Sequence, residues 1–303
     1  MALGSNQVTT TTAATFIPEI WSDEIVAAYK KNLVLANLFK KMSFVGKKGD
    51  VVHIPSPSRG TASLKAANTQ VNLIAATEGD VTVTINQHYE YSRLIEDIVE
   101  AQALTSLRRF YTEDAGYALS KQVDSSLIQL GRTFNGGSGV TYGGAYIGGD
   151  GTTAYTSGAN NATALTDAAI RRTIQRLDDN DVPMDGRFFL IPPSSRNTLM
   201  GLARYTEQAF VGESGTNNTI RNGEIGNLYG IPVFVSSNCD TATGGARVAL
   251  LGHKDAAVLV EQQGVRSQTQ YKQEYLGTLY TADTLYGVAE LRDNACFALA
   301  VPA

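Results

Sequence analysis

Three histidines and a short aspartate cluster are the residues of this sequence whose type suits metal chemistry. His53, His88 and His253 lie far apart in the chain, and none has a second histidine or a cysteine at the spacing of a metal site. The aspartates within Asp178–Asp181 lack the glycine and glutamate that complete a calcium loop. We therefore interpret the histidines as structural or surface residues, the aspartates as a solvated helix end, and expect no metal site.

Two adjacent serines, Ser194 and Ser195, are the candidate nucleophiles that a hydrolase would use. The Gly-x-Ser-x-Gly elbow is absent, because Ser214 is followed by glycine and threonine. No Walker-type Gly-Lys-Ser/Thr is present, and the glycine-rich tract at 136–149 lacks the strand-to-helix context of a phosphate-binding loop. The sequence therefore predicts no catalytic residues, no cofactor and no enzyme.

The amino-acid composition excludes further classes of protein. The 303 residues are 43% hydrophobic and 18% charged, which excludes general disorder but leaves charge scarcer than the ~25% of typical soluble domains. The net charge of -4 argues against a dedicated nucleic-acid binder. Cys239 and Cys296 cannot form a disulfide-rich scaffold, and we expect both to be reduced and buried. We see no basic leader and no apolar run of ~20 residues, so we expect no membrane contact.

The elements that would position these residues begin with a threonine-rich arm at 5–15, too poor in large apolar groups to fold alone. Pro18 starts a predicted helix, in which Trp21 anchors the chain against the body. A second helical piece is predicted over 33–41.

A β-rich excursion follows. Val51, Val52 and Ile54 form one strand, and the alternation over 81–85 predicts its return strand. About 20 mostly small and polar residues lie between the two, and a structureless loop of that length is unusual in a compact domain. We predict a long two-stranded flap that projects from the body, with Arg59 and Lys65 near its tip.

The strongest helical pattern runs from Leu104 to Leu130, with Gly131 placed as a C-cap. Leu119, Val123 and Leu127 fall on its predicted core face. At 1.5 Å per residue such a helix spans the molecule as a strut. Six charged residues are predicted for its outer face: Arg108, Arg109, Glu113, Asp114, Lys121 and Asp124.

The remainder has an α/β pattern. Residues 134–161 predict a turn-rich insertion with a hairpin around 142–146, and Thr166 predicts a helix N-cap. Further predicted elements are a strand over 187–191, a helix over 194–205, and strands over 231–235 and 247–251.

This order of elements resembles the major capsid proteins of tailed bacteriophages, which have the Hong Kong-type fold. The resemblance rests on Phe16-Ile17-Pro18-Glu19-Ile20-Trp21-Ser22, Asn32-Leu33-Val34, Leu38-Phe39, Gly49-Asp50-Val51-Val52-x-Ile54-Pro55, Ile95-Glu96-Asp97 and Gly226-x-Leu228-x-Gly230-Ile231-Pro232-Val233-x-Val235-Ser236. Together these motifs cover most of the chain in the family's order.

The resemblance implies an α+β fold with an N-terminal arm and short helices (1–45), an extended β-hairpin loop (46–92), a peripheral domain with a long spine helix (93–159 and 264–290), and an α/β axial domain (160–263 and 291–303). It also implies a structural protein that self-assembles into pentamers and hexamers, forming the icosahedral shell around a double-stranded DNA genome. The implied location is the virion, after assembly in the host cytoplasm.

The implied partners are copies of the same chain, a portal, a separate scaffolding protein, a decoration protein, and DNA bound non-specifically on the inner face. Arg59, Lys65 and Trp21 are the candidate inter-subunit contacts. Some members crosslink a flap lysine to a neighbour's asparagine; Lys65 and Asn294 are the conceivable pair, but no local feature marks either residue. Two alternatives remain open: a cellular encapsulin shell of the same fold, and an unrelated α/β enzyme.

Overall fold

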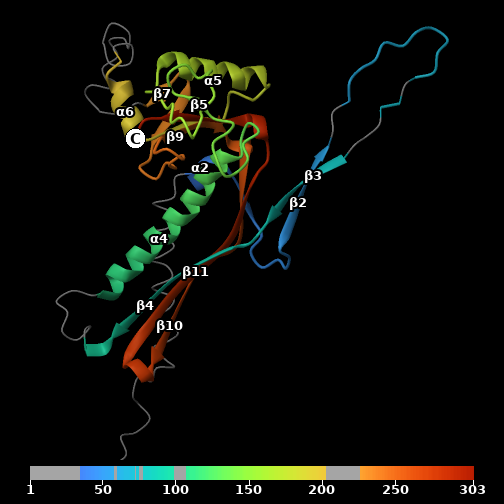
Figure 1. Cartoon of the computed structure of the whole chain (residues 1–303). Coiled ribbons are helices and arrows are strands. Elements are labelled where there is room, and N and C mark those ends of the chain that lie inside the picture. The colour runs from blue at the N-terminus through green and yellow to red at the C-terminus, as the bar shows by residue number, and fades with distance from the viewer. Residues whose placement is uncertain (1–34, 58–59, 72, 75–77, 99–106, 203–225) are drawn as a thin grey trace, which may run out of the picture.

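The computed structural model describes residues 35–57, 60–71, 73–74, 78–98, 107–202 and 226–303. They form a lobe, a long narrow sheet that leaves the lobe, and a two-stranded hairpin that projects to one side (Figure 1). The arm predicted at 5–15 and the helix predicted from Pro18, including Trp21, lie outside the described residues.

The lobe is built on a six-stranded sheet of order β5-β12-β9-β6-β8-β7. Its strands are β5 (Tyr146–Ile147), β6 (Arg187–Ile191), β7 (Asn227–Leu228), β8 (Ile231–Val235), β9 (Arg247–His253) and β12 (Cys296–Val301). The central strands β6, β9 and β12 are almost entirely buried, which explains their continuous apolar sequences. The strands predicted over 187–191, 231–235 and 247–251 are confirmed.

Two helices pack on the lobe. Helix α5 (Asp167–Asp179) begins as predicted, because the Thr166 side chain accepts a hydrogen bond from the Ala169 N–H. Helix α6 (Pro193–Met200) is shorter than the predicted 194–205, since Gly201 follows it as the C-cap. Of the hairpin predicted around 142–146, the structure has a single antiparallel bridge between Tyr146 and Ala154, while β5 itself pairs in parallel with β12.

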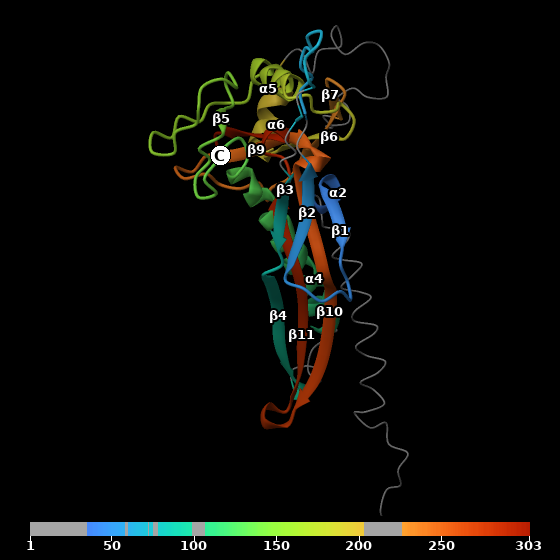
Figure 2. The same ribbon diagram turned by 90° about the vertical axis from the view of Figure 1, so that its right-hand side faces the viewer.

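A four-stranded sheet of order β1-β10-β11-β4 extends away from the lobe (Figure 2). Its strands are β1 (Lys40–Ser43), β4 (Gln87–Glu96), β10 (Ala257–Lys272) and β11 (Gly277–Glu290). Short 3-10 turns, η2 (Lys254–Ala256) and η4 (Asp293–Ala295), connect β10 and β11 to the lobe strands β9 and β12. The long β10–β11 pair is therefore an excursion between two central strands of the lobe.

Helix α4 (Leu107–Gln129) lies along this sheet and contacts β4 and β11. Its 23 residues span about 35 Å. Leu119, Val123 and Leu127 are buried, as their spacing predicts. The predicted C-cap is wrong, because the chain continues into a 3-10 turn, η1 (Leu130–Arg132). Gly131 lies inside that turn, where an added Cβ would be 2.8 Å from Leu250 Cδ2, so a larger residue would have to displace that buried side chain.

The segment predicted as a helix over 33–41 contains a short helix and the start of a strand in the structure. Only α2 (Leu35–Leu38) is helical, and Lys40 begins β1, which pairs in parallel with β10 from Val258. Residues 33 and 34 lie outside the described residues. Lys40 and Lys41 form a strand because β10 is available as a pairing partner. Local helix propensity does not take such a distant partner into account.

Asp124 also departs from the prediction, which placed it on the outer face of the strut. It is 4% exposed and accepts hydrogen bonds from the Leu35 N–H at 2.9 Å and from Asn238 Nδ2 at 3.0 Å. The carboxylate thus satisfies an N–H at the start of α2 and ties helix α4 to the lobe.

Replacing Asp124 with alanine should lower the free energy of unfolding by about 1–3 kcal/mol, because it leaves the buried Leu35 N–H without its acceptor and removes one of the two acceptors of the half-buried Asn238 amide. Urea unfolding of the unassembled subunit measures this. Lys121→Ala, one turn earlier on the exposed side of α4, is the matched control and should change stability by less than about 0.5 kcal/mol. Equal effects would show that the Asp124 contacts contribute nothing.

Candidate functional site

The projecting hairpin consists of β2 (Val51–Pro57) and β3 (Glu78–Thr84), paired antiparallel from Val51↔Thr84 to Pro57↔Glu78. The return strand that the alternation over 81–85 predicts is therefore confirmed. Val83 and Ile85 are buried against Val258 and Val260 of β10. This small second core fixes the base of the hairpin to the long sheet, while the hairpin itself points away (Figure 1).

The loop at the end of the hairpin exposes large apolar side chains. Leu64 is fully exposed, Leu73 is 92% exposed, and more than half of Val71 and Ile74 is also in solvent. Nothing in the described part of the chain covers them. Exposing large apolar side chains to water does not stabilise a monomer. Groups of such exposed side chains mark interaction sites. The sequence predicts a segment of mostly small and polar residues here, and these four large apolar residues are the signal in it for a contact surface.

The predicted contact candidates are only partly described. Lys65 lies in the loop next to Leu64, is exposed, and forms no ion pair within the described residues. Arg59 and Trp21 lie outside them. Asn294 lies in η4, where its carbonyl accepts a hydrogen bond from Asn180 Nδ2.

A second group of exposed apolar side chains lies at the opposite extremity, where η3 (Gln273–Tyr275) joins β10 to β11. Tyr275 is 61% exposed and Leu276 67%. Leu276 has a left-handed backbone with φ of 44°, a conformation that is uncommon for residues other than glycine. The turn therefore holds two large side chains outward in a fixed shape.

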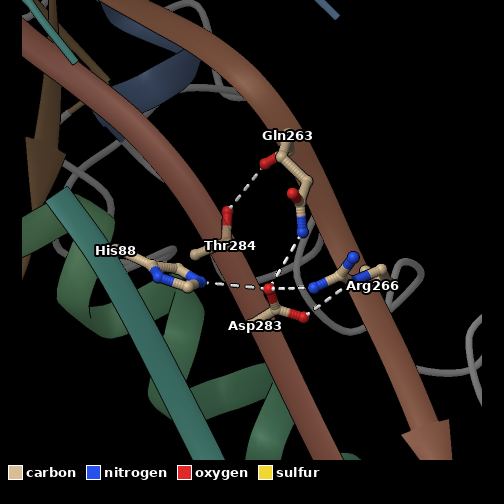
Figure 3. Close-up of polar contacts among 5 residues, drawn as sticks. All are labelled: His88, Gln263, Arg266, Asp283 and Thr284. Carbon is tan, nitrogen blue, oxygen red and sulfur yellow. Dashed lines mark hydrogen bonds and ion pairs between the residues drawn. The ribbon is translucent and has the colours of Figure 1, made fainter. Parts of the chain in front are cut away.

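Between these extremities, a buried carboxylate joins three strands of the long sheet. Asp283 on β11 accepts hydrogen bonds from His88 Nε2 (3.1 Å) on β4 and from Gln263 Nε2 (2.9 Å) and Arg266 (3.1 and 2.9 Å) on β10 (Figure 3). Thr284 Oγ1 donates to the Gln263 carbonyl at 3.2 Å. Burial alone would raise the pKa of Asp283, but the hydrogen bonds from Arg266 and His88 outweigh it and lower that pKa.

This cluster lies where β10 is irregular. The β10–β11 register shifts between Glu261 and Gln263 and again between Gln263 and Arg266. Such bulges bend a strand and increase its twist. The hydrogen bonds to Asp283 therefore stabilise the bend of the long sheet. The cluster joins positions up to 195 residues apart, so no local sequence signal marks it.

The other residues considered for chemistry have structural partners. His53 pairs with Asp80 at 2.5 Å across the hairpin, and His253 contacts the Asp185 carbonyl at 2.7 Å. Asp178 pairs with Arg187 at 2.7 Å. Among the described residues no group of His, Cys, Asp or Glu is arranged to hold a metal ion.

The serines and cysteines show no catalytic arrangement. Ser194 Oγ donates to the Pro302 carbonyl, and the buried Ser195 hydroxyl has no hydrogen-bond partner in the described structure. Cys239 and Cys296 are both free and buried. Burial raises the pKa of Cys239 to about 12 and raises that of Cys296 as well, so neither is a reactive thiolate.

No helix in the described part of the chain is both long and apolar enough to cross a membrane.

Comparison with known families decides the class. The model of a family described as phage capsid protein matches residues 95–294, about two thirds of the chain. The chain belongs to the phage capsid protein family. It is a structural protein of the bacteriophage capsid, a major capsid protein rather than an enzyme, and its place is the virion. The alternative of an unrelated α/β enzyme is therefore excluded.

Solved structures agree on the fold of this capsid protein. A chain from Mycobacterium phage Che8 is 24% identical, with a TM-score of 0.70 over 88% of this chain and 90% of that one. A chain from the capsid of the cyanophage P-SCSP1u is 19% identical, with a TM-score of 0.70 over 89% and 88%. A chain from the mature capsid of bacteriophage PhiM1 is 14% identical, with a TM-score of 0.66 over 89% and 87%. No curated protein is similar in sequence. The predicted α+β capsid fold is confirmed.

The Asp283 cluster generates a pH prediction. Asp283→Asn should lower the free energy of unfolding by about 1.5–3 kcal/mol at pH 7, because the variant loses the charged acceptor. Since the folded pKa lies below the unfolded value of about 3.9, this stabilisation is present above that pH and is lost as the pH falls through the folded pKa.

The difference between wild type and variant should therefore shrink toward zero in acid. Urea unfolding of the unassembled subunit between pH 7 and pH 2 measures it. The control is Asp97→Asn, an exposed carboxylate with one contact to the Tyr271 hydroxyl; it should change stability by less than about 0.5 kcal/mol. A difference that stays constant with pH would contradict the role assigned to the Asp283 charge.

Proposed function

We propose that this capsid protein self-assembles into pentamers and hexamers that form an icosahedral shell around a double-stranded DNA genome. The observation that best supports the proposal is the projecting hairpin, whose loop presents Leu64, Val71, Leu73 and Ile74 to solvent far from the body of its own subunit. No residue in the described part of the same chain covers these side chains, and we assign their burial to a neighbouring subunit.

The geometry favours rings. The hairpin base is fixed in the small core with Val258 and Val260, so the loop projects in one defined direction. A loop on one copy that meets a different surface on the next copy makes a heterologous contact, and such contacts close into rings when the rotation between copies allows it. In the proposed shell the loop lies over a neighbouring subunit of the same kind.

Each part of the structure is assigned to one domain of a capsid subunit. We assign the six-stranded lobe, with α5 and α6, to an axial domain that surrounds the symmetry axes. The long sheet and α4, acting as the spine helix, form a peripheral domain, and β2 and β3 form the extended loop. In this assignment residues 1–45 form the N-terminal arm with short helices. These four parts together make up the proposed Hong Kong-type fold.

Charge supports a non-specific relation to DNA. The net charge of -4 avoids tight binding of a phosphate polymer, which would be strongly salt-dependent and would impede packing and release. We propose contact with DNA on the inner face, assembly in the host cytoplasm, and a portal, a separate scaffolding protein and a decoration protein as partners.

The loop provides the test. Replacing Leu64 and Leu73 with serine should leave the subunit folded, since both side chains are exposed, but should raise the protein concentration needed for assembly at least tenfold. Burying one leucine contributes about 1.5–3 kcal/mol, which is more than a factor of ten in an equilibrium constant. Light scattering and electron microscopy of the purified protein measure shell yield, and circular dichroism checks folding.

The matched control is Ser63→Ala with Gln70→Ala, which changes two exposed polar residues of the same loop. Its shell yield should equal that of the wild type. Unchanged assembly of the leucine variant, or a stable wild-type monomer at micromolar concentration, would contradict the proposal. Native particles that contain a cargo enzyme and no DNA would contradict the proposed genome and favour the encapsulin alternative for what the shell encloses.

A further inference from the structure

We propose that the pocket at the base of the hairpin binds the β10–β11 turn of a second copy, with Glu274 of one copy facing Lys48 of the other. The inference rests on the proposed function and deepens it by naming two surfaces that meet. The pocket has a volume of about 300 Å³ and lies between the 44–50 turn, β2 and β10. Phe44, Val52 and Ile85 line it with apolar groups, and Lys47 and Lys48 also line it.

The pocket is built before any partner arrives. Gln262 Nε2 donates to the carbonyls of Lys47 and Gly49, both at 2.9 Å, and the Phe44 N–H donates to the Glu261 carbonyl at 2.8 Å. These bonds tie the 44–50 turn to β10. Gly49 has a φ of 142°, which a larger residue rarely adopts. Little ordering entropy is therefore lost when a ligand binds there.

The lining defines the ligand chemistry. The Lys47 ammonium lies 4.9 Å from the centre of the Phe44 ring, and the exposed Lys48 forms no ion pair within the described residues. Val45 and Val51 are exposed beside the lysines. A matching group has large apolar side chains next to a carboxylate.

The turn at the far end of the long sheet has this composition. Glu274 is exposed and has no ion pair in the described part of the chain, and it is followed directly by the exposed Tyr275 and Leu276. The Asp97 N–H donates to the Leu276 carbonyl at 3.0 Å. An added Cβ at Gly277 would lie 2.6 Å from the Ile95 carbonyl oxygen. The turn is therefore held closely against the end of β4 as a preformed knob.

The occupant must come from another copy. Lys272, before the turn, lies ten positions after Gln262 of the pocket on β10, which is about 33 Å of extended strand. The turn lies at the end of the β10–β11 pair that is far from β2 and β3 (Figure 2). The hairpin loop of a second copy is the competing occupant, but residues 60–74 contain no acidic residue. Charge complementarity therefore favours the turn.

A charge exchange tests the contact. Lys48→Glu and Glu274→Lys should each lower shell yield at least tenfold at a fixed protein concentration, because each places like charges together. The double variant should restore the yield to within about threefold of the wild type, because it re-forms the pair with its charges exchanged. Both residues are exposed, so the subunits should stay folded by circular dichroism.

Lys65→Glu combined with Glu274→Lys is the matched control and should show no restoration, since the two residues are not proposed to meet. A double exchange at 48 and 274 that assembles no better than its worse single variant would overturn the inference. If the wild type forms shells in the same experiment, the proposed function survives that result. A wild type that forms none would contradict the proposed function itself.

A crosslink gives a second measurement that does not depend on charge. Val51→Cys with Leu276→Cys should give disulfide-linked oligomers in assembled particles on a non-reducing gel, whereas each single variant should not. The two native cysteines are buried and do not compete. Assembled particles of the double variant that remain monomeric on that gel would also overturn the inference.

Discussion

The pairing of β10 with β11 is the constraint on which the other long elements depend. Both strands continue from central strands of the lobe through one short turn each, so the lobe fixes where the pair begins. Strand β1 pairs with β10, β4 pairs with β11, and α4 packs along the same sheet. The base of the hairpin is held by Val258 and Val260 of β10. A displacement of this pair would move every surface to which we assign a role in assembly.

The register of that pair is interrupted where Asp283 lies. A buried carboxylate is costly unless hydrogen-bond donors and an opposite charge surround it; here Arg266 supplies the positive charge, and Gln263 and His88 supply further hydrogen bonds. The bend of β10 at the bulges and the burial of the Asp283 charge therefore depend on each other. The irregular strand brings donors from two neighbouring strands to one oxygen pair, and their hydrogen bonds hold the irregular strand in place.

Local patterns predicted the elements that depend on local rules. Alternation identified β3, apolar runs identified β6 and β9, and Thr166 identified the start of α5. Features that depend on distant partners were missed. The sequence predicts Asp124 in solvent because the two groups that donate to its carboxylate, the Leu35 N–H and the Asn238 amide, are 89 and 114 residues away in the chain. Gly131 was taken for a cap because its contact with Leu250 is tertiary. The Asp283 cluster and the pocket at the hairpin base are likewise assembled only by the fold.

The two-stranded hairpin has two open edges, which is a hazard in a protein that must associate with its own copies. Unpaired strand edges invite neighbours to add strands without limit. Strand β2 contains Pro55 and Pro57, which offer no N–H at these positions, and proline is found on strands at edges of this kind. Unlimited β-pairing is thereby discouraged at an element that projects from the body of the subunit. Contacts with the hairpin are left to side chains, whose association is reversible, and reversible contacts allow a growing assembly to correct its errors.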